Sequence, residues 1–334
     1  MRYLSVCSGI EAASVAWEPL GWTPVAFAEI EKFPSKVLAH HYPGVANLGD
    51  MTRFREWDIE RGAVDVLVGG TPCQSFSVAG LRKGLDDPRG NLALTFIAMV
   101  DHYRPEWVIW ENVPGVLSSS GGRDFGSFLG ALGQLGYGFA YRVLDAQYFG
   151  VPQRRRRVFV VAHSSGDSRR AAEILFEPES LRGDSPKTQS QEEGRFWNGS
   201  TITQTLDAVL HKGQMMPEKN RFPVVTTGEL SFSHTNVTST EIAQYVTLIT
   251  PSAIVLDHIK KMNMSTVKTK TASLLPVGLR KLTPTECERL QGFPDGYTDI
   301  MPNTPDSPRY KALGNSMAVP VMRWIGSRIA LATK

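Results

Sequence analysis

Cysteine is scarce in this sequence: the 334 residues include three cysteines, and none of them forms a Cys-x-x-Cys pair. We therefore expect neither a disulfide framework nor a zinc site made of cysteines, and the chain is typical of a reduced intracellular protein. Long apolar runs are also lacking, since none approaches the roughly 20 residues of a membrane span. The N-terminus lacks the apolar core of a signal peptide, so we expect a soluble cytoplasmic protein. The net charge of +3 permits an acidic partner without requiring one.

Short apolar runs that alternate with helical patterns are what the sequence does have. We expect strands at residues 3–6, 24–29, 64–68, 107–110, 141–144 and 158–162, and helices at 12–17, 92–103 and 125–135. This alternation predicts an α/β fold with a largely parallel sheet. It stops near residue 164, and residues 164–271 are rich in Ser, Thr, Gln and Lys. The change in composition predicts a second, irregular domain. Regular structure resumes with a helix that starts at Pro284 after Thr283, a good N-cap residue.

The stretch Gly69-Gly70-Thr71-Pro72-Cys73 follows the strand expected at residues 64–68. Glycine and proline end the strand abruptly, which places Cys73 on a loop at its carboxyl end, where open α/β sheets bind ligands. Cys73 is therefore a candidate nucleophile, provided that its pKa is lowered or that the substrate is held against it. The alternative is a small apolar residue packed under a turn.

Charged residues also follow other expected strands. Glu29 lies about 20 positions after the turn at Gly9, where a carboxylate binds ribose hydroxyls; alternatively, it interacts with a helix dipole. Glu111 ends the fourth strand and is either a catalytic acid or a solvated loop residue. Four arginines, 154–157, precede the last strand, and strand alternation places Arg155 and Arg157 on one face. They either line a site or form a charge cluster at an edge.

Five segments, in this order, resemble the motifs of the DNA cytosine methyltransferases that methylate carbon 5, in particular the bacterial and phage restriction–modification type. Pro72-Cys73-Gln74 resembles the nucleophile motif, Glu111-Asn112-Val113 the acid motif, and Gln153-x-Arg155-x-Arg157 the arginine motif. Residues 280–294 and Gly314-Asn315-Ser316 resemble the last two motifs. The resemblance implies a Rossmann-like S-adenosylmethionine-dependent methyltransferase sheet in a catalytic domain, residues 1–163 plus 279–334. It also implies a smaller, irregular target-recognition domain, residues 164–278.

The resemblance assigns the catalytic roles. Carbon 5 of cytosine is too electron-poor to attack a sulfonium methyl group, so a thiolate, from Cys73, first adds at carbon 6 of a cytosine flipped out of a specific duplex sequence. Glu111 is expected to bind N3, and Arg155 or Arg157 to stabilise charge on O2. No metal is expected.

The implied cofactor is S-adenosylmethionine, which leaves as S-adenosylhomocysteine. The residues expected to bind it are Cys7, Ser8, Gly9, Ile10, Glu29, Ile30, Asp50, Met51, Pro72, Leu92, Asn315 and Ser316. The chain departs from the family pattern at two positions. The turn at residues 7–12 has a single glycine and lacks the usual Phe, and Ile30 stands where an aromatic residue is frequent. The second departure predicts aliphatic contacts to the adenine.

Double-stranded DNA is the partner that the resemblance implies. The glycine-rich, charged loop at residues 76–91 is expected to close over the flipped base. The candidates for DNA contact are Gln74, Ser75, Arg82, Lys83, Arg89, Arg195, Lys212 and Arg221. We expect a monomer in the bacterial cytosol or nucleoid, with no membrane partner and with a cognate restriction endonuclease as a candidate partner.

Three other functions compete with this interpretation. An RNA (tRNA) cytosine-5 methyltransferase would share the fold, but the Cys-Phe-Thr signature typical of that branch is missing. A catalytically inactive DNA-binding protein would not need Cys73, Glu111 and both arginines. A cysteine hydrolase would need a histidine paired with Cys73, and no sequence feature indicates one.

Overall fold

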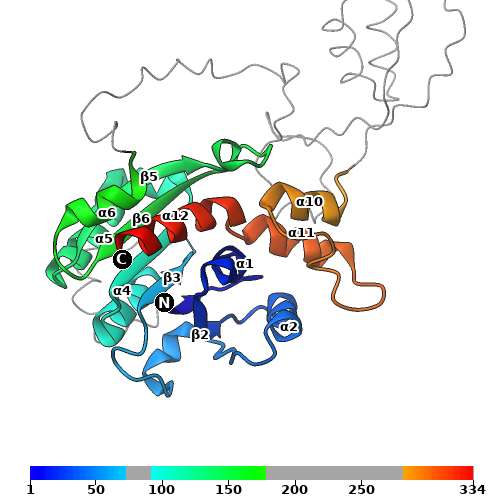
Figure 1. Cartoon of the computed structure of the whole chain (residues 1–334), viewed down its shortest axis with the longest axis horizontal. Coiled ribbons are helices and arrows are strands. Elements are labelled where there is room, and N and C mark those ends of the chain that lie inside the picture. The colour runs from blue at the N-terminus through cyan, green and yellow to red at the C-terminus, as the bar shows by residue number, and fades with distance from the viewer. Residues whose placement is uncertain (73–91, 178–280, 334) are drawn as a thin grey trace, which may run out of the picture. The chain divides into compact units, whose positions relative to one another are not determined.

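A six-stranded sheet forms the centre of the molecule (Figure 1). The computed structural model describes residues 1–72, 92–177 and 281–333. The strands are β1 (Arg2–Val6), β2 (Thr23–Ala28), β3 (Val66–Gly69), β4 (Trp107–Asn112), β5 (Gly138–Asp145) and β6 (Arg156–His163). They are arranged in the order β2-β1-β3-β4-β6-β5; β1 to β4 are parallel, and β6 runs antiparallel to both of its neighbours. All six expected strands and the α/β fold are confirmed.

Helices surround this sheet. They are α1 (Ala12–Trp17), α2 (Lys32–His41), α4 (Leu92–Tyr103), α5 (Arg123–Gln134), α6 (Ser168–Leu175), α10 (Pro284–Gln291), α11 (Asp306–Asn315) and α12 (Val319–Ala332). Short 3-10 turns lie between them: η1 (Glu18–Leu20), η2 (Met51–Glu56), η4 (Pro114–Leu117), η5 (Ser119–Gly122) and η6 (Ala146–Phe149). The expected helices at 12–17 and 92–103, and the helix start at Pro284, are confirmed.

The sheet is buried on both faces. Leu4 and Trp110 belong to a core cluster with Phe96 of α4 and Phe128 of α5. Tyr3 points the other way, because successive strand side chains alternate, and its ring packs edge-on against Trp17 of α1 at 5.1 Å between centroids. Burial on both faces explains why these strands are continuous apolar runs rather than alternating ones.

The C-terminal segment returns to the first strands (Figure 1). Trp17 Nε1 donates a hydrogen bond of 2.8 Å to the carbonyl of Met322 in α12, across 305 positions of sequence. Before α11, the ring of Tyr297 stacks on His41 of α2 at 4.0 Å, and its hydroxyl donates to the carbonyl of Ile10 at 2.9 Å. Residues from the far end of the chain therefore lie next to the loops that follow β1 and β2.

The region beyond residue 163 begins as part of this body. Helix α6 packs against β5, β6 and α12, and Arg142 of β5 donates to the carbonyl of Leu175 at 2.7 Å. The sheet-containing body thus continues past the expected boundary at residue 163. The rest of the expected target-recognition domain, residues 178–278, lies outside the described residues.

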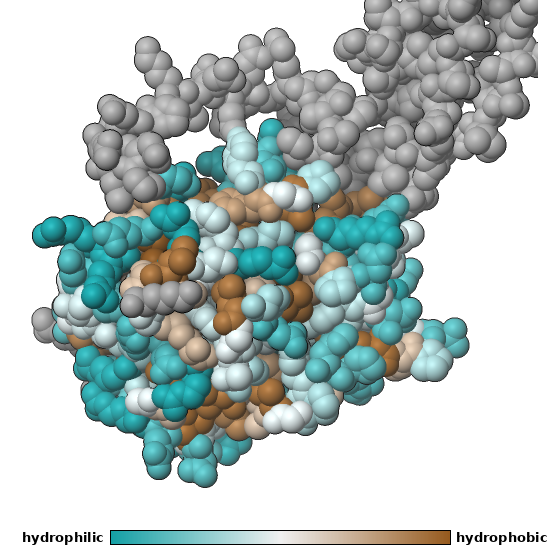
Figure 2. Space-filling view, in the orientation of Figure 1, coloured by the Kyte–Doolittle hydropathy of each residue, from teal (hydrophilic) through white to brown (hydrophobic). Residues whose placement is uncertain are grey.

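The surface of the described part is mixed in polarity. On the face shown in Figure 2, apolar residues form small separate areas among polar ones. Among the residues that the structure describes, no helix is both long enough and apolar enough to span a membrane.

Candidate active site

Two neighbouring strand ends form the centre of the site. The parallel register pairs Gly69 of β3 with Trp110 of β4, so Gly70 lies next to Glu111. A Cβ on Gly70 would lie 2.9 Å from Glu111 Oε2, so a larger residue here would displace the carboxylate. Thr71 is held from both sides: Trp110 Nε1 donates to its hydroxyl at 2.9 Å, and Asn112 Nδ2 donates to its carbonyl at 3.0 Å. The backbone that leads into Pro72 and Cys73 is therefore fixed to the strand that carries Glu111.

Glu111 forms an ion pair with Arg157. Arg157 Nε lies 3.1 Å from Glu111 Oε1, and both side chains are largely buried. Burial raises the pKa of the Glu111 carboxyl, and the charges of Arg157 and Arg155 oppose this rise without cancelling it. A carboxyl group with a raised pKa holds a proton more readily near neutral pH and can donate it to a ring nitrogen. The alternative of a solvated loop glutamate is thereby excluded.

The four arginines alternate as strand geometry requires. Arg155 and Arg157 point into the protein, whereas Arg154 and Arg156 are exposed. The two inward arginines do not share a role, however. Arg155 Nη2 donates to the carbonyl of Ser316 at 2.6 Å and to that of Gly314 at 3.1 Å. Arg157 is therefore the guanidinium paired with Glu111, and the expected role of either arginine at O2 stays a prediction.

A cavity of about 750 Å³ opens along these strand ends. Its volume suits a cofactor-sized ligand. Residues expected to bind the cofactor line it, namely Cys7, Gly9, Glu29, Ile30, Asp50, Met51, Pro72, Leu92 and Asn315. Glu111, Arg155 and Arg157 line the same cavity. The structure thus joins the expected cofactor residues and the described catalytic candidates in one space.

The turn after β1 forms a cradle at this cavity. Gly9 has a φ of +57°, and a Cβ at this position would meet nothing within 4 Å, so the backbone faces open space. Its amide donates to Glu29 Oε2 at 2.8 Å, and the amide of Glu31 donates to Oε1 at 2.7 Å. These bonds fix the Glu29 carboxylate at the end of β2, where it can accept hydrogen bonds from ribose hydroxyls. The residues present fit S-adenosylmethionine.

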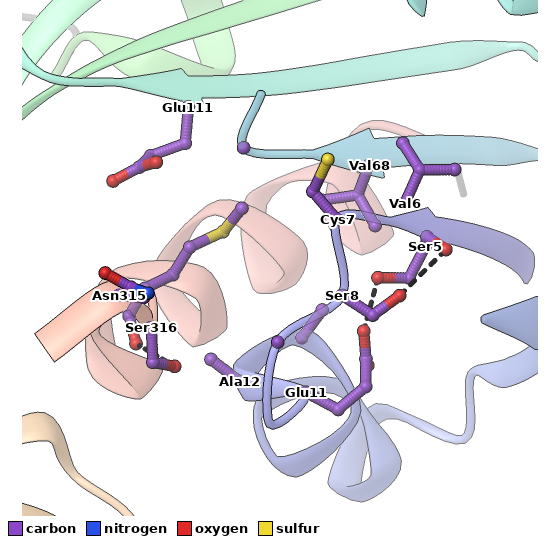
Figure 3. Close-up of a pocket in the computed structure, with 14 residues that line it drawn as sticks. Ser5, Val6, Cys7, Ser8, Glu11, Ala12, Val68, Glu111, Asn315 and Ser316 are labelled. Atoms are coloured by element: carbon purple, nitrogen blue, oxygen red, sulfur yellow. Dashed lines mark hydrogen bonds between the residues drawn. The ribbon is translucent and has the colours of Figure 1, made fainter. Parts of the chain in front are cut away.

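A smaller cavity of about 40 Å³ lies beside the turn and is lined by Ser8, Glu111, Asn315 and Ser316 among others (Figure 3). Glu111 projects from β4 toward the side on which Asn315 and Ser316 lie. The hydroxyl of Ser8 donates to the carbonyl of Ser5 at 2.9 Å and accepts from the amide of Ala28 at 3.1 Å. Ser8 therefore joins the ends of β1 and β2.

Ile10 differs from the other residues expected in the cofactor turn. Its side chain is fully buried and lines neither cavity, although the sequence places it in the cofactor turn. The left-handed backbone at Gly9 and Glu11 turns the chain into α1, which directs the Ile10 side chain into the core. Its carbonyl accepts a hydrogen bond from the Tyr297 hydroxyl at 2.9 Å, and its expected contact with the cofactor stays a prediction.

The sequence did not predict several residues that line the large cavity. Phe33, at the start of α2, supplies an aromatic ring near Ile30, so aliphatic contacts are not the only apolar ones available to a base. Lys311 of α11 forms an ion pair with Glu31 at 2.7 Å. Phe33 lies only three positions after Ile30, a signal that was available in the sequence. Nothing in the sequence pairs Lys311 with Glu31, because 280 positions separate them.

The two described cysteines are poor nucleophiles. Burial, followed by the charges of Glu29 and Asp50, raises the pKa of Cys7 to about 12. Burial also raises the pKa of Cys287 to about 12, and its side chain is almost completely enclosed. Both remain protonated thiols at neutral pH. Cys73 is therefore the remaining candidate among the three cysteines.

Cys73 itself lies outside the described residues. The same holds for all the candidates for DNA contact: Gln74, Ser75, Arg82, Lys83, Arg89, Arg195, Lys212 and Arg221. Their expected roles stay predictions. In the described part of the chain, no group of three or more His, Cys, Asp or Glu residues is arranged to hold a metal ion.

Comparison with known proteins decides the family. The model of the C-5 cytosine-specific DNA methylases matches residues 1–331. The chain belongs to this family. One curated relative is the type II methyltransferase M.SsoII of Shigella sonnei. It is 31% identical to this chain over 98% of the chain and 79% of its own length. M.NgoBI of Neisseria gonorrhoeae is 30% identical over 96% of the chain and 90% of its own length.

A further relative carries a different name. A protein of Escherichia phage P1 named DNA N-6-adenine-methyltransferase is 38% identical over 99% of the chain. The chain spans 61% of the length of that phage protein.

Solved structures show the same fold. The DNMT2 structure of Spodoptera frugiperda aligns over 100% of the chain and 99% of its own length with a TM-score of 0.62 at 19% identity. A putative DNA modification methyltransferase encoded within an Escherichia coli prophage covers 100% of the chain and 99% of its own, with a TM-score of 0.53 at 16% identity. The Rossmann-like methyltransferase sheet is thereby confirmed for this family member.

Proposed function

We propose that this protein transfers a methyl group from S-adenosylmethionine to carbon 5 of a flipped-out cytosine in a specific double-stranded DNA sequence. The observation that carries the proposal is the Glu111–Arg157 ion pair, which lies against Gly70, three residues before Cys73. Pro72, the last described residue before Cys73, lines the same cavity as Glu111 and Arg157, which supports the proposal.

The reaction on the base follows from these groups. The Cys73 thiolate forms a bond to carbon 6, and the electron pair moves toward N3, which takes a proton from Glu111. Arg157 stabilises the charge that develops on O2. S-adenosylmethionine, when bound, supplies an electrophilic methyl group. After methylation, water removes the carbon 5 proton, the sulfur–carbon bond breaks, and Glu111 regains its proton from N3.

The cofactor is held by the chain's own strand ends. Glu29 would accept hydrogen bonds from the ribose hydroxyls, and Gly9 and Asn315, which line the same cavity, would hold the rest of the cofactor. Ile30, which is 73% exposed, and Phe33 supply apolar contacts for the adenine. The cavity that these residues share with Glu111 brings donor and acceptor together.

Adenine methylation is the alternative that the name of the phage P1 relative raises. Methylation of an exocyclic amine needs neither a thiolate nor a group that protonates a ring nitrogen during covalent addition. If the protein methylated adenine, neither the Pro72-Cys73 segment nor the Glu111–Arg157 pair would have a role in the reaction. These groups favour carbon 5 of cytosine.

The product base tests the proposal. Duplex DNA and tRNA are incubated with the protein and labelled S-adenosylmethionine, hydrolysed to nucleosides and separated. We expect label in 5-methylcytosine from duplex DNA, and we expect the Cys73→Ala variant to give none while still binding DNA. Label in N6-methyladenine, label confined to tRNA, or full activity of Cys73→Ala each contradicts the proposal. A duplex containing 5-fluorocytosine should trap the wild-type protein covalently and leave Cys73→Ala free.

A further inference from the structure

The end of α11, which carries Asn315, is held by three buried side chains from elsewhere in the chain. Gln291, the last residue of α10, donates from Nε2 to the carbonyl of Leu313 at 2.7 Å. Arg155 donates to the carbonyls of Gly314 and Ser316. Gln153 donates from Nε2 to the carbonyl of Leu290 at 3.1 Å and so fixes the end of α10. We call Gln153, Arg155 and Gln291 the carbonyl clamp.

The clamp adds side-chain bonds at the end of a helix, where the carbonyl of Leu313 also accepts from the amide of Ser316 at 3.2 Å. Helix α11 ends at Asn315, and the last carbonyls of a helix have no partner within it. Side chains from α10 and from the segment before β6 supply those partners on both sides of Asn315. Asn315 itself is exposed and lines both cavities. The clamp therefore fixes the backbone of a residue whose side chain faces the proposed cofactor.

Burial makes this arrangement costly. Gln291 and Gln153 are fully buried, and their Oε1 atoms have no hydrogen-bond partner among the described residues. A buried amide oxygen without a partner lowers stability, and an apolar side chain of similar size avoids that loss. An apolar side chain could fill the space of Gln291 equally well, but only a hydrogen-bond donor such as the glutamine amide can hold the carbonyl of Leu313.

The end of α10 is also locked against α12. A Cβ on Gly292, which has a φ of +80°, would overlap the ring of Pro320. Only glycine permits this close approach in this conformation. The close contact of Gly292 with Pro320 fixes the end of α10, from which the Gln291 amide donates to the carbonyl of Leu313.

We propose that Gln291 is a positioning residue for the cofactor, which acts by holding the Leu313–Ser316 segment so that Asn315 faces the cavity. The inference rests on the proposed function, since it assumes that Asn315 binds S-adenosylmethionine. It adds a residue on α10, outside the cavity, to the machinery that sets cofactor affinity.

Cofactor binding without DNA tests this role. The dissociation constant of S-adenosylhomocysteine is measured by calorimetry on the full chain for wild type, Gln291→Met, Asn315→Ala and the double variant. We expect Gln291→Met to weaken binding about tenfold, as the loss of a buried hydrogen bond does. We expect the same substitution to have little further effect once Asn315 is alanine, because the cycle isolates action through that residue.

Two further variants control for stability. Tyr137→Phe removes another buried hydrogen bond, to the carbonyl of Pro105 at 2.6 Å; neither residue lines a cavity, so binding should be unchanged. Gln291→Asn withdraws the amide by one methylene and serves if Gln291→Met fails to fold. Additive effects in the cycle, or Gln291 variants that lose thermal stability like Tyr137→Phe but bind within about twofold of wild type, overturn the inference. Absence of binding by the wild type contradicts the proposed function instead.

Discussion

Replacement of Glu111 by glutamine is the sharpest test of the chemistry. The substitution keeps the shape of the side chain and removes its ability to give a proton to N3. The amide oxygen of glutamine can still accept a hydrogen bond from Arg157 Nε, which lies 3.1 Å from Glu111 Oε1, so the substitution removes chiefly the proton. Loss of a positioned general acid lowers rates by about 10²–10⁴-fold. We expect the single-turnover methylation rate to fall by about this factor, with cofactor affinity little changed.

The pH profile adds a second, independent signature. Burial raises the pKa of Glu111, so the protonated, active form persists to a higher pH than for an ordinary glutamate. The wild-type rate should decline as pH rises through that pKa. In Glu111→Gln this decline should be absent, because no carboxyl remains to lose its proton.

A matched control separates catalysis from folding. Asp124 is also a buried carboxylate; it accepts a hydrogen bond from Ser120 Oγ at 2.9 Å and lines neither cavity. Asp124→Asn should lower the free energy of unfolding in urea by about 1–3 kcal/mol and leave the methylation rate within about twofold. If Glu111→Gln retains more than about a tenth of the wild-type rate, the assignment of Glu111 as the acid is refuted.

Three other perturbations follow from the geometry. Gly9→Ala places a methyl group in the cavity at a φ of +57°. It should lower the free energy of unfolding by about 1 kcal/mol in urea titrations and weaken S-adenosylhomocysteine binding in calorimetry. Unchanged affinity would contradict the interpretation of this turn as a cofactor cradle. Lys311→Ala breaks an exposed ion pair with Glu31 and should weaken cofactor binding less than about fivefold, an effect that high salt abolishes. Burial lowers the pKa of His163, so the unfolded state binds the proton more tightly, and stability should fall as pH drops below about 6.5. His163→Gln should reduce this pH dependence in urea titrations near pH 6 and pH 8. An unchanged pH dependence in the variant would contradict the role of His163.

Local patterns in the sequence determined most of the fold. Short apolar runs marked the inner strands β3 and β4, because a strand buried on both faces needs continuous apolar residues. The alternation of a strand placed Arg155 and Arg157 on the inward face. The spacing of Gly9 and Glu29 predicted a carboxylate at the cofactor turn, and the two residues are in fact hydrogen bonded.

Only the tertiary structure decided what each inward group contacts. Arg155 binds the carbonyls of Gly314 and Ser316, about 160 positions away, while Arg157 binds Glu111. A periodic pattern gives the direction of a side chain but not its partner, since the partner depends on how distant helices pack. The burial of Ile10, the raised pKa of Glu111 and the pairing of Lys311 with Glu31 have the same origin. Each depends on the return of the C-terminal helices, or of a neighbouring strand, to the ends of the first strands.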